Sequence, residues 1–160
     1  MLNTLDELIE DIEENNDVSS SIKKYSGTDW KKYIKIDDEF YHRELVYRCE
    51  KFDVVIITWN VKQSSKIHNH PTSCHMKILH GCLNENVYIK QDQNLVQSFL
   101  FDIEPKHVFE LLKTNIRHKD DMGFMNDSGL HSIENISSDT IAVSLNIYAP
   151  SNFKTTYYSL

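Results

Sequence analysis

The sequence predicts a mainly β domain with short helices near its N-terminus. Three observations support this fold class: a run of β-branched and aromatic residues at 52–59, many short apolar stretches after it, and few helical patterns. Numerous short strands with few helices are typical of β-sandwiches and β-barrels. With 160 residues, 40% of them hydrophobic, the chain can form one core. We therefore expect a single domain over 1–160, with a helical part over 1–35 and a barrel over about 39–155.

The first predicted helix begins near Thr4. Thr4 and Glu7, three residues later, form the capping-box pattern that starts many helices. Apolar residues recur at helical spacing on one face: Leu5, Leu8, Ile9 and Ile12. This pattern predicts an amphipathic helix that packs on the barrel or, alternatively, binds a partner. Gly27 interrupts the chain before a second predicted helix near 28–35, and the assignment of 19–33 stays ambiguous.

Strand patterns dominate from residue 39 onward. We expect strands near 41–49, 52–59, 65–70, 75–79, 86–90, 97–101, 123–126, 131–135 and 140–148. The segment 104–115 differs from the rest. Val108, Leu111 and Leu112 have helical spacing there, and they follow a proline, which is common in a first helical turn. We therefore predict a short inserted helix over 104–115.

Composition limits the partners of the protein. A net charge of −7 without a clustered basic patch disfavours nucleic acid. The longest apolar runs, such as 54–58, are too short to span a bilayer, and no apolar signal sequence follows Met1. Cys49, Cys74 and Cys82 form no disulfide-scaffold pattern, which agrees with a reducing compartment. We expect a cytoplasmic monomer that binds neither nucleic acid nor a membrane.

Histidines mark the candidate functional site. His68 and His70 are two residues apart in a predicted strand, so both imidazoles point to the same face and can bind one metal ion. A third histidine, His131, lies in the sequence GLHSIEN. The alternative is that His68 and His70 are exposed strand residues. His75 and His80 are predicted to lie at the surface, because their spacing of five places them on opposite faces of a strand.

The spacing around these histidines resembles a known family. His-x-His is followed after three residues by Cys74 and after six more by Gly81, which resembles the first metal-site motif of the cupins with cysteine in place of the usual glutamate. Together with YHRELV at 41–46, GLHSIEN and SLNIYAP at 144–150, this pattern resembles the cysteine dioxygenase family. The resemblance covers roughly 30–155 in collinear order. It implies a cupin jelly-roll β-barrel and an iron-dependent thiol dioxygenase.

The resemblance implies a metal centre formed by His68, His70 and His131. Three imidazoles would leave about three positions of an octahedral ion open, as an oxygen-dependent enzyme requires. Because the imidazoles are neutral, Fe(II) would keep its full charge and attract a thiolate. Fe(II) is the expected cofactor, and zinc or nickel could occupy the same three ligands.

Arg43 and Tyr41 are the candidate substrate-binding residues. A guanidinium group suits bidentate recognition of a carboxylate. The resemblance places Arg43 against the α-carboxylate of the substrate, with Tyr41 nearby. This favours L-cysteine, or another small mercapto acid such as 3-mercaptopropionate, over thiols that lack a carboxylate. A surface arginine on a strand edge is the alternative interpretation.

Cys74 and Tyr148 are the candidate catalytic residues. In the family, a thioether bond joins the equivalent cysteine and tyrosine, and the phenol oxygen approaches the reacting groups. Relative to animal members, this chain lacks one residue between His70 and Cys74, which could change the reach of the cysteine. A buried small cysteine and a barrel tyrosine are the alternative interpretation. The resemblance also implies a cis peptide bond at 149–150.

Asn146 departs from the family pattern. Family members have a histidine at this position, and an amide cannot carry a proton at neutral pH as an imidazole can. Trp59, Tyr88 and Glu85 also match family positions, but packing and turns explain them equally well. The implied reaction converts L-cysteine and O2 to cysteine sulfinic acid. Two alternatives stay open: a dioxygenase for another small thiol and a catalytically inactive metal-binding cupin.

Overall fold

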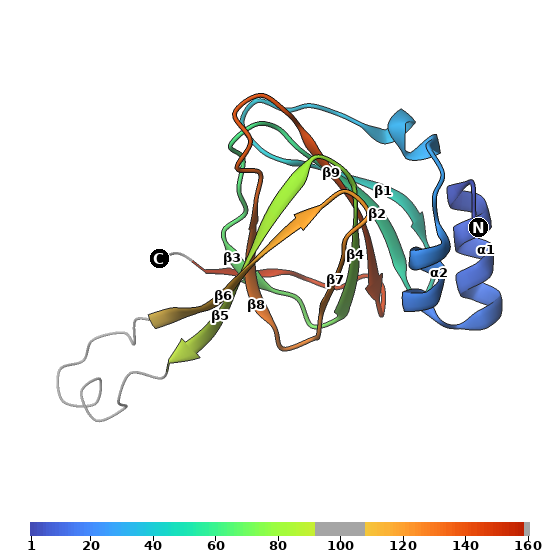
Figure 1. Cartoon of the computed structure of the whole chain (residues 1–160). Helices are drawn as coiled ribbons and strands as arrows, with labels where there is room; N and C mark the ends of the chain where they lie inside the picture. The colour runs from blue at the N-terminus through green and yellow to red at the C-terminus, as the bar shows by residue number, and fades with distance from the viewer. Residues whose placement is uncertain (92–107, 159–160) are drawn as a thin grey trace.

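The computed structural model describes residues 1–91 and 108–158. Two five-stranded sheets face each other as a barrel, and two helices pack on the outside of one of them (Figure 1). The mainly β fold with N-terminal helices is thus confirmed. The elements are α1 (Leu5–Asn15), α2 (Val18–Lys24), a 3-10 helix (Asp29–Tyr33), β1 (His42–Arg48), β2 (Asp53–Trp59), β3 (Ile67–Asn69), β4 (Ser73–His80), β5 (Cys82–Gln91), β6 (Val108–His118), β7 (Met122–Met125), β8 (Leu130–Glu134), β9 (Ala142–Ala149) and β10 (Thr156–Tyr158).

Helix α1 begins where the capping pattern predicts. The hydroxyl of Thr4 accepts a hydrogen bond from the backbone N–H of Glu7 at 3.1 Å, and the Glu7 carboxylate accepts one from the backbone N–H of Asn3 at 2.6 Å. The predicted apolar face is buried: Leu5, Leu8, Ile9 and Ile12. Helix α2 occupies part of the ambiguous region, and the helix expected near 28–35 is a single short 3-10 segment.

The first sheet has the strand order β1-β2-β9-β4-β7, and its two faces have different surroundings. Because side chains alternate along a strand, neighbouring residues of β9 point to opposite faces. Leu145 and Ile147 pack in a core cluster with Leu8 and other helix residues. Asn146 and Tyr148 line the barrel interior instead. The outer face of this sheet therefore holds the helices, while its inner face contributes to a cavity.

The second sheet has the order β10-β3-β8-β5-β6, and here one prediction was wrong. Residues 108–118 form strand β6, which pairs with the whole of β5, and not the inserted helix predicted for 104–115. Val108, Leu111 and Leu112 are exposed, so their helical spacing does not mark a buried helix face. Cross-strand pairing decides the structure of this segment. Residues 104–107 and the strand predicted at 97–101 lie outside the described residues.

The other predicted strands each overlap an observed strand, and β10 is an additional strand that the sequence patterns did not predict. The peptide bond between Ala149 and Pro150 is cis, as the resemblance implies. In the described part of the chain, the helices are too short and too polar to cross a membrane.

Leu145→Ala is expected to lower the free energy of unfolding by about 2–5 kcal/mol, because it leaves a void in the core between the helices and β9. Leu145 is 0% exposed, whereas Leu112 on β6 is 60% exposed. The matched control Leu112→Ala should change stability by less than about 0.5 kcal/mol. Chemical denaturation followed by circular dichroism measures both variants, and equal effects would contradict this assignment of the core.

Candidate metal centre

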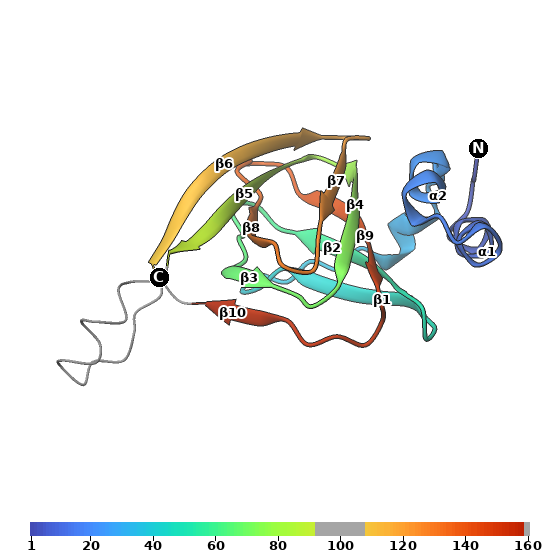
Figure 2. The ribbon, with the colours of Figure 1, turned by 90° about the horizontal axis from the view of Figure 1, so that it is seen from below.

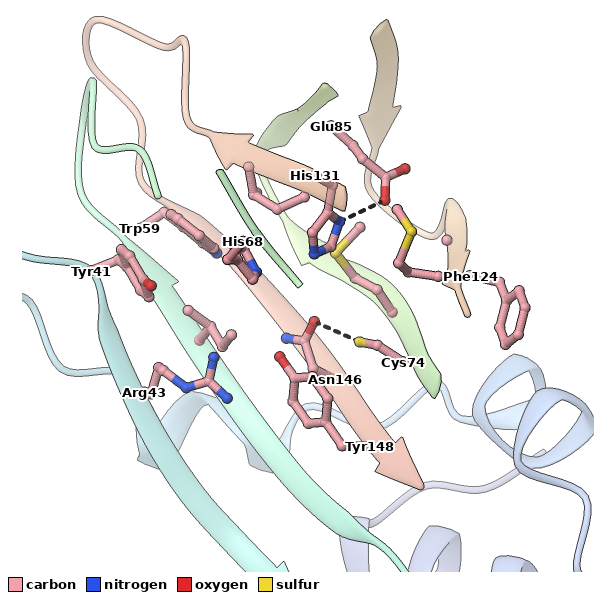
Figure 3. Close-up of a pocket in the computed structure, with 15 residues that line it drawn as sticks. Tyr41, Arg43, Trp59, His68, Cys74, Glu85, Phe124, His131, Asn146 and Tyr148 are labelled. Carbon is pink, nitrogen blue, oxygen red and sulfur yellow. Dashed lines mark hydrogen bonds and ion pairs between the residues drawn. The ribbon is translucent and has the colours of Figure 1, made fainter. Parts of the chain in front are cut away.

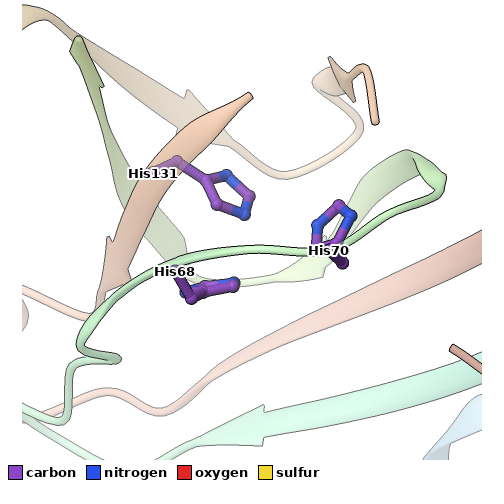
Figure 4. A group of neighbouring side chains, drawn as sticks. All are labelled: His68, His70 and His131. Atoms are coloured by element: carbon purple, nitrogen blue, oxygen red, sulfur yellow. The ribbon is translucent and has the colours of Figure 1, made fainter. Parts of the chain in front are cut away.

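Three histidine side chains converge inside the barrel. His68 lies on β3, His70 follows that strand, and His131 on β8 pairs directly with His68. One nitrogen from each ring lies within 4.8 Å of the others, and all three residues are buried (Figure 4). Within residues 1–91 and 108–158, no other three histidine, cysteine or acidic side chains form such a group. Exposed His80 and half-buried His75 lie outside it.

Hydrogen bonds fix which nitrogen of each ring carries the proton. Nδ1 of His68 lies 2.9 Å from the backbone oxygen of Lys66. Nδ1 of His70 lies 2.8 Å from the backbone oxygen of Thr72. Because a carbonyl oxygen can only accept, each Nδ1 donates its proton, and each Nε2 keeps a free lone pair for a metal ion.

The remaining ring nitrogens fit a metal ion. In the described structure, the Nε2 atoms of His70 and His131 are buried without a hydrogen-bond partner. Such an atom destabilises the fold unless a ligand binds it. Burial lowers the pKa of His68 to about 3 and that of His70 to about 4. Both rings are therefore neutral at physiological pH, as metal ligands must be.

Glu85 on β5 orients the third histidine. Its carboxylate accepts a hydrogen bond from Nδ1 of His131 at 3.3 Å, drawn as a dashed line in Figure 3, and forms an ion pair with Arg117 on β6. Burial alone would raise the pKa of Glu85, but the hydrogen bonds from His131 and Arg117 outweigh burial and lower it to about 2. In the sequence, Glu85 matches a family position but is explained equally well by packing or a turn, and its partner Arg117 is 32 residues away.

Glu85→Gln is expected to weaken metal binding by about 10- to 100-fold, because a neutral amide is a weaker hydrogen-bond acceptor for the Nδ1–H of His131 than a carboxylate. Titration of the metal-free protein with Co(II), in competition with a chelator, measures the affinity. Glu110→Gln, which replaces an exposed acid on β6, is the matched control and should leave the affinity unchanged. The same affinity in both variants would show that Glu85 does not support the centre.

A cavity lies beside the histidines, between the two sheets (Figure 3). We call it the inner cavity. Six of the residues predicted for the site line it: Tyr41, Arg43, His68, Cys74, His131 and Tyr148. The seventh, His70, lies next to it, with its ring centroid 5.3 Å from that of Tyr148. The structure therefore brings the predicted metal, substrate and catalytic residues together.

Arg43 on β1 places a cation at the inner cavity. Its guanidinium carbon lies 5.2 Å from the centre of the Tyr148 ring, within the range of a cation–π contact. No ion pair joins Arg43 to an acid in the described part of the chain. Arg43 is half-buried, and a partly desolvated cation without a counter-ion is unfavourable. The site therefore suits an anionic ligand.

Cys74 and Tyr148 face each other across adjacent strands. They are partners in the ladder between β4 and β9, and the Cβ atoms of directly opposite residues are about 4.5–5.5 Å apart. The shortened spacing after His70 thus still leaves the cysteine opposite the tyrosine. Burial raises the pKa of Cys74 to about 12 and also raises the pKa of Tyr148. Both groups keep their protons at neutral pH.

Hydrogen bonds fix the orientation of the Asn146 amide. Its Nδ2 donates to the hydroxyl of Ser144 at 2.9 Å, and that hydroxyl also accepts from Nε1 of Trp59 at 3.4 Å. The thiol of Cys74 donates weakly to Oδ1 of Asn146 at 3.9 Å. The amide therefore presents its oxygen, a pure acceptor, toward Cys74.

The segment after β9 lies against the site. The ring centroid of Phe153 is 4.6 Å from that of Tyr148, and that of Tyr157 is 5.6 Å from that of His68. Tyr41 also forms a hydrogen bond with Tyr157, which together with burial raises the pKa of Tyr41. Figure 2 shows this segment running beside the barrel to β10, which pairs with β3. Sequence patterns gave no signal for these contacts.

The two sheets and the buried histidine group define the class of protein, a cupin with a metal centre. A protein with a double-stranded β-helix domain from Klebsiella pneumoniae has a TM-score of 0.60 and 13% identity, over 81% of this chain and 94% of that one. The TT1209 protein from Thermus thermophilus has a TM-score of 0.59 and 16% identity, over 77% of this chain and 95% of that one. Identities this low show the shared fold alone.

The sequence comparisons give the family. The protein-family model described as cysteine dioxygenase type I matches residues 1–159. Cysteine dioxygenase type 1 of Danio rerio is 32% identical over 139 residues, 84% of this chain and 64% of the relative. That of Homo sapiens is 35% identical over 128 residues, 77% of this chain and 58% of the relative. The chain belongs to the cysteine dioxygenase type I family, and it spans less than two thirds of the length of these relatives.

Proposed function

We propose that this protein is a non-haem iron thiol dioxygenase that converts L-cysteine and O2 to cysteine sulfinic acid. One observation carries the proposal: three buried, converging imidazoles and a cation, Arg43, that has no acidic partner among the described residues lie at or beside one cavity. The imidazoles suit a divalent metal ion and the cation suits a carboxylate. A small thiol acid has the two groups that this arrangement can bind at once. Membership in the cysteine dioxygenase family supports the same chemistry.

His68, His70 and His131 would bind Fe(II) through their Nε2 atoms. Three neutral ligands leave the charge of the ion uncompensated and about three octahedral positions free. When bound, iron would supply adjacent positions for the thiol sulfur and O2 and the electrons that activate O2. Zinc or nickel suits the same nitrogen ligands, so iron itself is part of the proposal.

Arg43 would hold the carboxylate of the substrate. Its planar fork can donate two parallel hydrogen bonds to a carboxylate, which fixes the orientation of the bound thiol. Tyr41 stacks on Trp59 with ring centroids 4.3 Å apart, so that the two rings form a rigid wall of the inner cavity near Arg43. Since Arg43, His68 and His131 line one cavity, a carboxylate held at Arg43 keeps the thiol end near the histidines.

Tyr148 would donate a hydrogen bond to the reacting oxygen atoms. Burial raises the pKa of Tyr148, so the phenol keeps the proton that it donates. We propose that Cys74, its partner across the ladder, forms a thioether bond with the phenol ring. Formation of this bond removes one hydrogen atom from the thiol and one from a ring carbon, and O2 accepts the two electrons and two protons.

Asn146 favours a second candidate, a dioxygenase for another small thiol such as 3-mercaptopropionate. The amide neither takes nor gives a proton near neutral pH, so this position of the cavity lining cannot act as an acid or a base. A mercapto acid without an amine has no ammonium proton to be removed before binding. The same residue is the argument for an inactive metal-binding cupin.

Oxygen consumption by the iron-loaded protein with L-cysteine, together with the mass of the product, tests the proposal. We expect one O2 consumed per cysteine and a product heavier by two oxygen atoms. Preference for 3-mercaptopropionate in a parallel assay would establish the second candidate. Bound iron without oxygen uptake on any small thiol would contradict both and favour a metal-binding cupin.

We further propose that the protein works as a single-domain monomer in the cytoplasm, with a small thiol and O2 as its partners. The three cysteines are free, which suits a reducing compartment.

A further inference from the structure

A second cavity adjoins the inner one. It has a volume of about 310 Å³, the size of a small ligand site, and lies between strands β1 and β2 and the segment that follows β9. We call it the outer cavity. The residues that matter for its function are Arg43, Leu45, Arg48, Asp53, Phe153 and Tyr157.

Arg43 is shared by the two cavities. Among the described residues, no other side chain lines both. Two further walls of the outer cavity contact the inner site, since Phe153 packs on Tyr148 and Tyr157 packs near His68. Arg43, Phe153 and Tyr157 therefore lie between the outer cavity and the inner site.

The outer cavity has one uncompensated charge. Arg48 and Asp53 form a two-bond ion pair, with Nε to Oδ1 at 2.7 Å and Nη2 to Oδ2 at 2.9 Å, so their charges cancel. Arg43 has no such partner in the described structure. A single cation in a recess with low-dielectric walls produces a focused positive potential. The outer cavity should therefore concentrate anions.

We propose that the outer cavity is a vestibule for small thiols that carry a carboxylate. The carboxylate is attracted to Arg43 from the outer cavity, and the same guanidinium then holds it in the inner cavity. Cationic thiols such as cysteamine are repelled at the first step. This inference rests on the proposed function, because it takes thiol acids as the ligands of the inner cavity.

Charge substitutions at Leu45 test the vestibule. Leu45 is 46% exposed, lines the outer cavity and not the inner one, and points to the same face of β1 as Arg43, two residues away. Leu45→Glu and Leu45→Lys add opposite charges there, and Leu45→Gln is the neutral control. Association of 3-mercaptopropionate and of cysteamine with the iron-loaded protein is followed under argon by stopped-flow tryptophan fluorescence, to which Trp59 in the inner cavity contributes.

We expect association of 3-mercaptopropionate to be about threefold slower in Leu45→Glu and about threefold faster in Leu45→Lys than in Leu45→Gln at low ionic strength. The difference should fade in high salt, and cysteamine should respond in the opposite direction. Equal rates in the three variants, or the same response for both thiols, would overturn the inference. Effects of Leu112→Glu and Leu112→Lys as large as those of the Leu45 variants would also overturn it, because Leu112 lies on the distant β6, where these variants change only the net charge.

The binding measurement needs no turnover, so the two proposals fail separately. Charge-dependent binding without later oxygen uptake would support the vestibule and contradict the dioxygenase. Oxygen uptake with charge-independent binding would do the reverse. A protein that binds neither thiol would contradict both.

Discussion

His131→Ala is expected to abolish iron binding and, with it, oxygen consumption. The histidine supplies one of three converging nitrogens, and its Nε2 is buried without a partner. Two imidazoles alone would bind the ion weakly and without the facial geometry. We expect iron content after dialysis to fall by about 100-fold or more, in line with the loss of one of few protein ligands. Metal analysis measures it directly.

His75→Ala is the control for this experiment. His75 packs on Phe124 with ring centroids 4.8 Å apart, outside the converging group. The His75→Ala variant should therefore bind as much iron as the unchanged protein. Circular dichroism establishes that both variants are folded, and His131→Asn, which keeps a polar side chain, serves if the alanine variant unfolds. A folded His131 variant with full iron content would refute the metal centre.

Arg43→Ala is expected to reduce kcat/KM for L-cysteine by about 100-fold or more while leaving iron content unchanged. Truncating one partner of a buried, hydrogen-bonded charge pair costs about 2–5 kcal/mol, and each 1.4 kcal/mol is tenfold. Arg43→Lys keeps the charge but loses the planar fork, so its activity should be intermediate. Steady-state oxygen consumption measures all three proteins.

The substrate itself is the control for Arg43. Cysteamine has a thiol and an amine but no carboxylate, so any activity on it should not fall in Arg43→Ala. A parallel loss for cysteine and cysteamine would mean that the variant damages the site in general. Undiminished activity on cysteine would mean that Arg43 does not hold the carboxylate.

Local patterns were sufficient to predict most of the fold. Strands β2 and β9, which are adjacent in the first sheet, correspond to the β-branched run at 52–59 and the apolar stretch at 140–148. They were predictable because a strand that is buried on both faces has a nearly continuous apolar sequence. The histidine pair on one strand was predictable for a similar reason, since a spacing of two fixes a shared face.

The prediction for 104–115 was wrong because a helical spacing of apolar residues indicates a helix only when these residues form a buried face. Leu111 and Leu112 are 52% and 60% exposed, so their spacing carries no information about a packed face. Pairing with β5 gives β6 its conformation, and a local window cannot detect a partner strand. Short β10 was missed for the same reason, since its ladder to β3 connects distant segments.

The role of Glu85 also depends on distant residues. An acid among the polar and apolar residues of β5 gives no sign that it is buried. Only the folded chain shows that His131 and Arg117 meet its carboxylate from β8 and β6. The outer cavity is a similar case, because it forms only when the segment with Phe153 and Tyr157 comes to lie near β1.

The alternation of side chains along β9 gives an engineer two independent sets of positions on one strand. Leu145 and Ile147 belong to the layer under the helices, while Asn146 and Tyr148 line the inner cavity. Repacking the first set can raise thermal tolerance without altering substrate selection. Conversely, libraries at the second set can change the lining of the inner cavity while the packing under the helices stays the same.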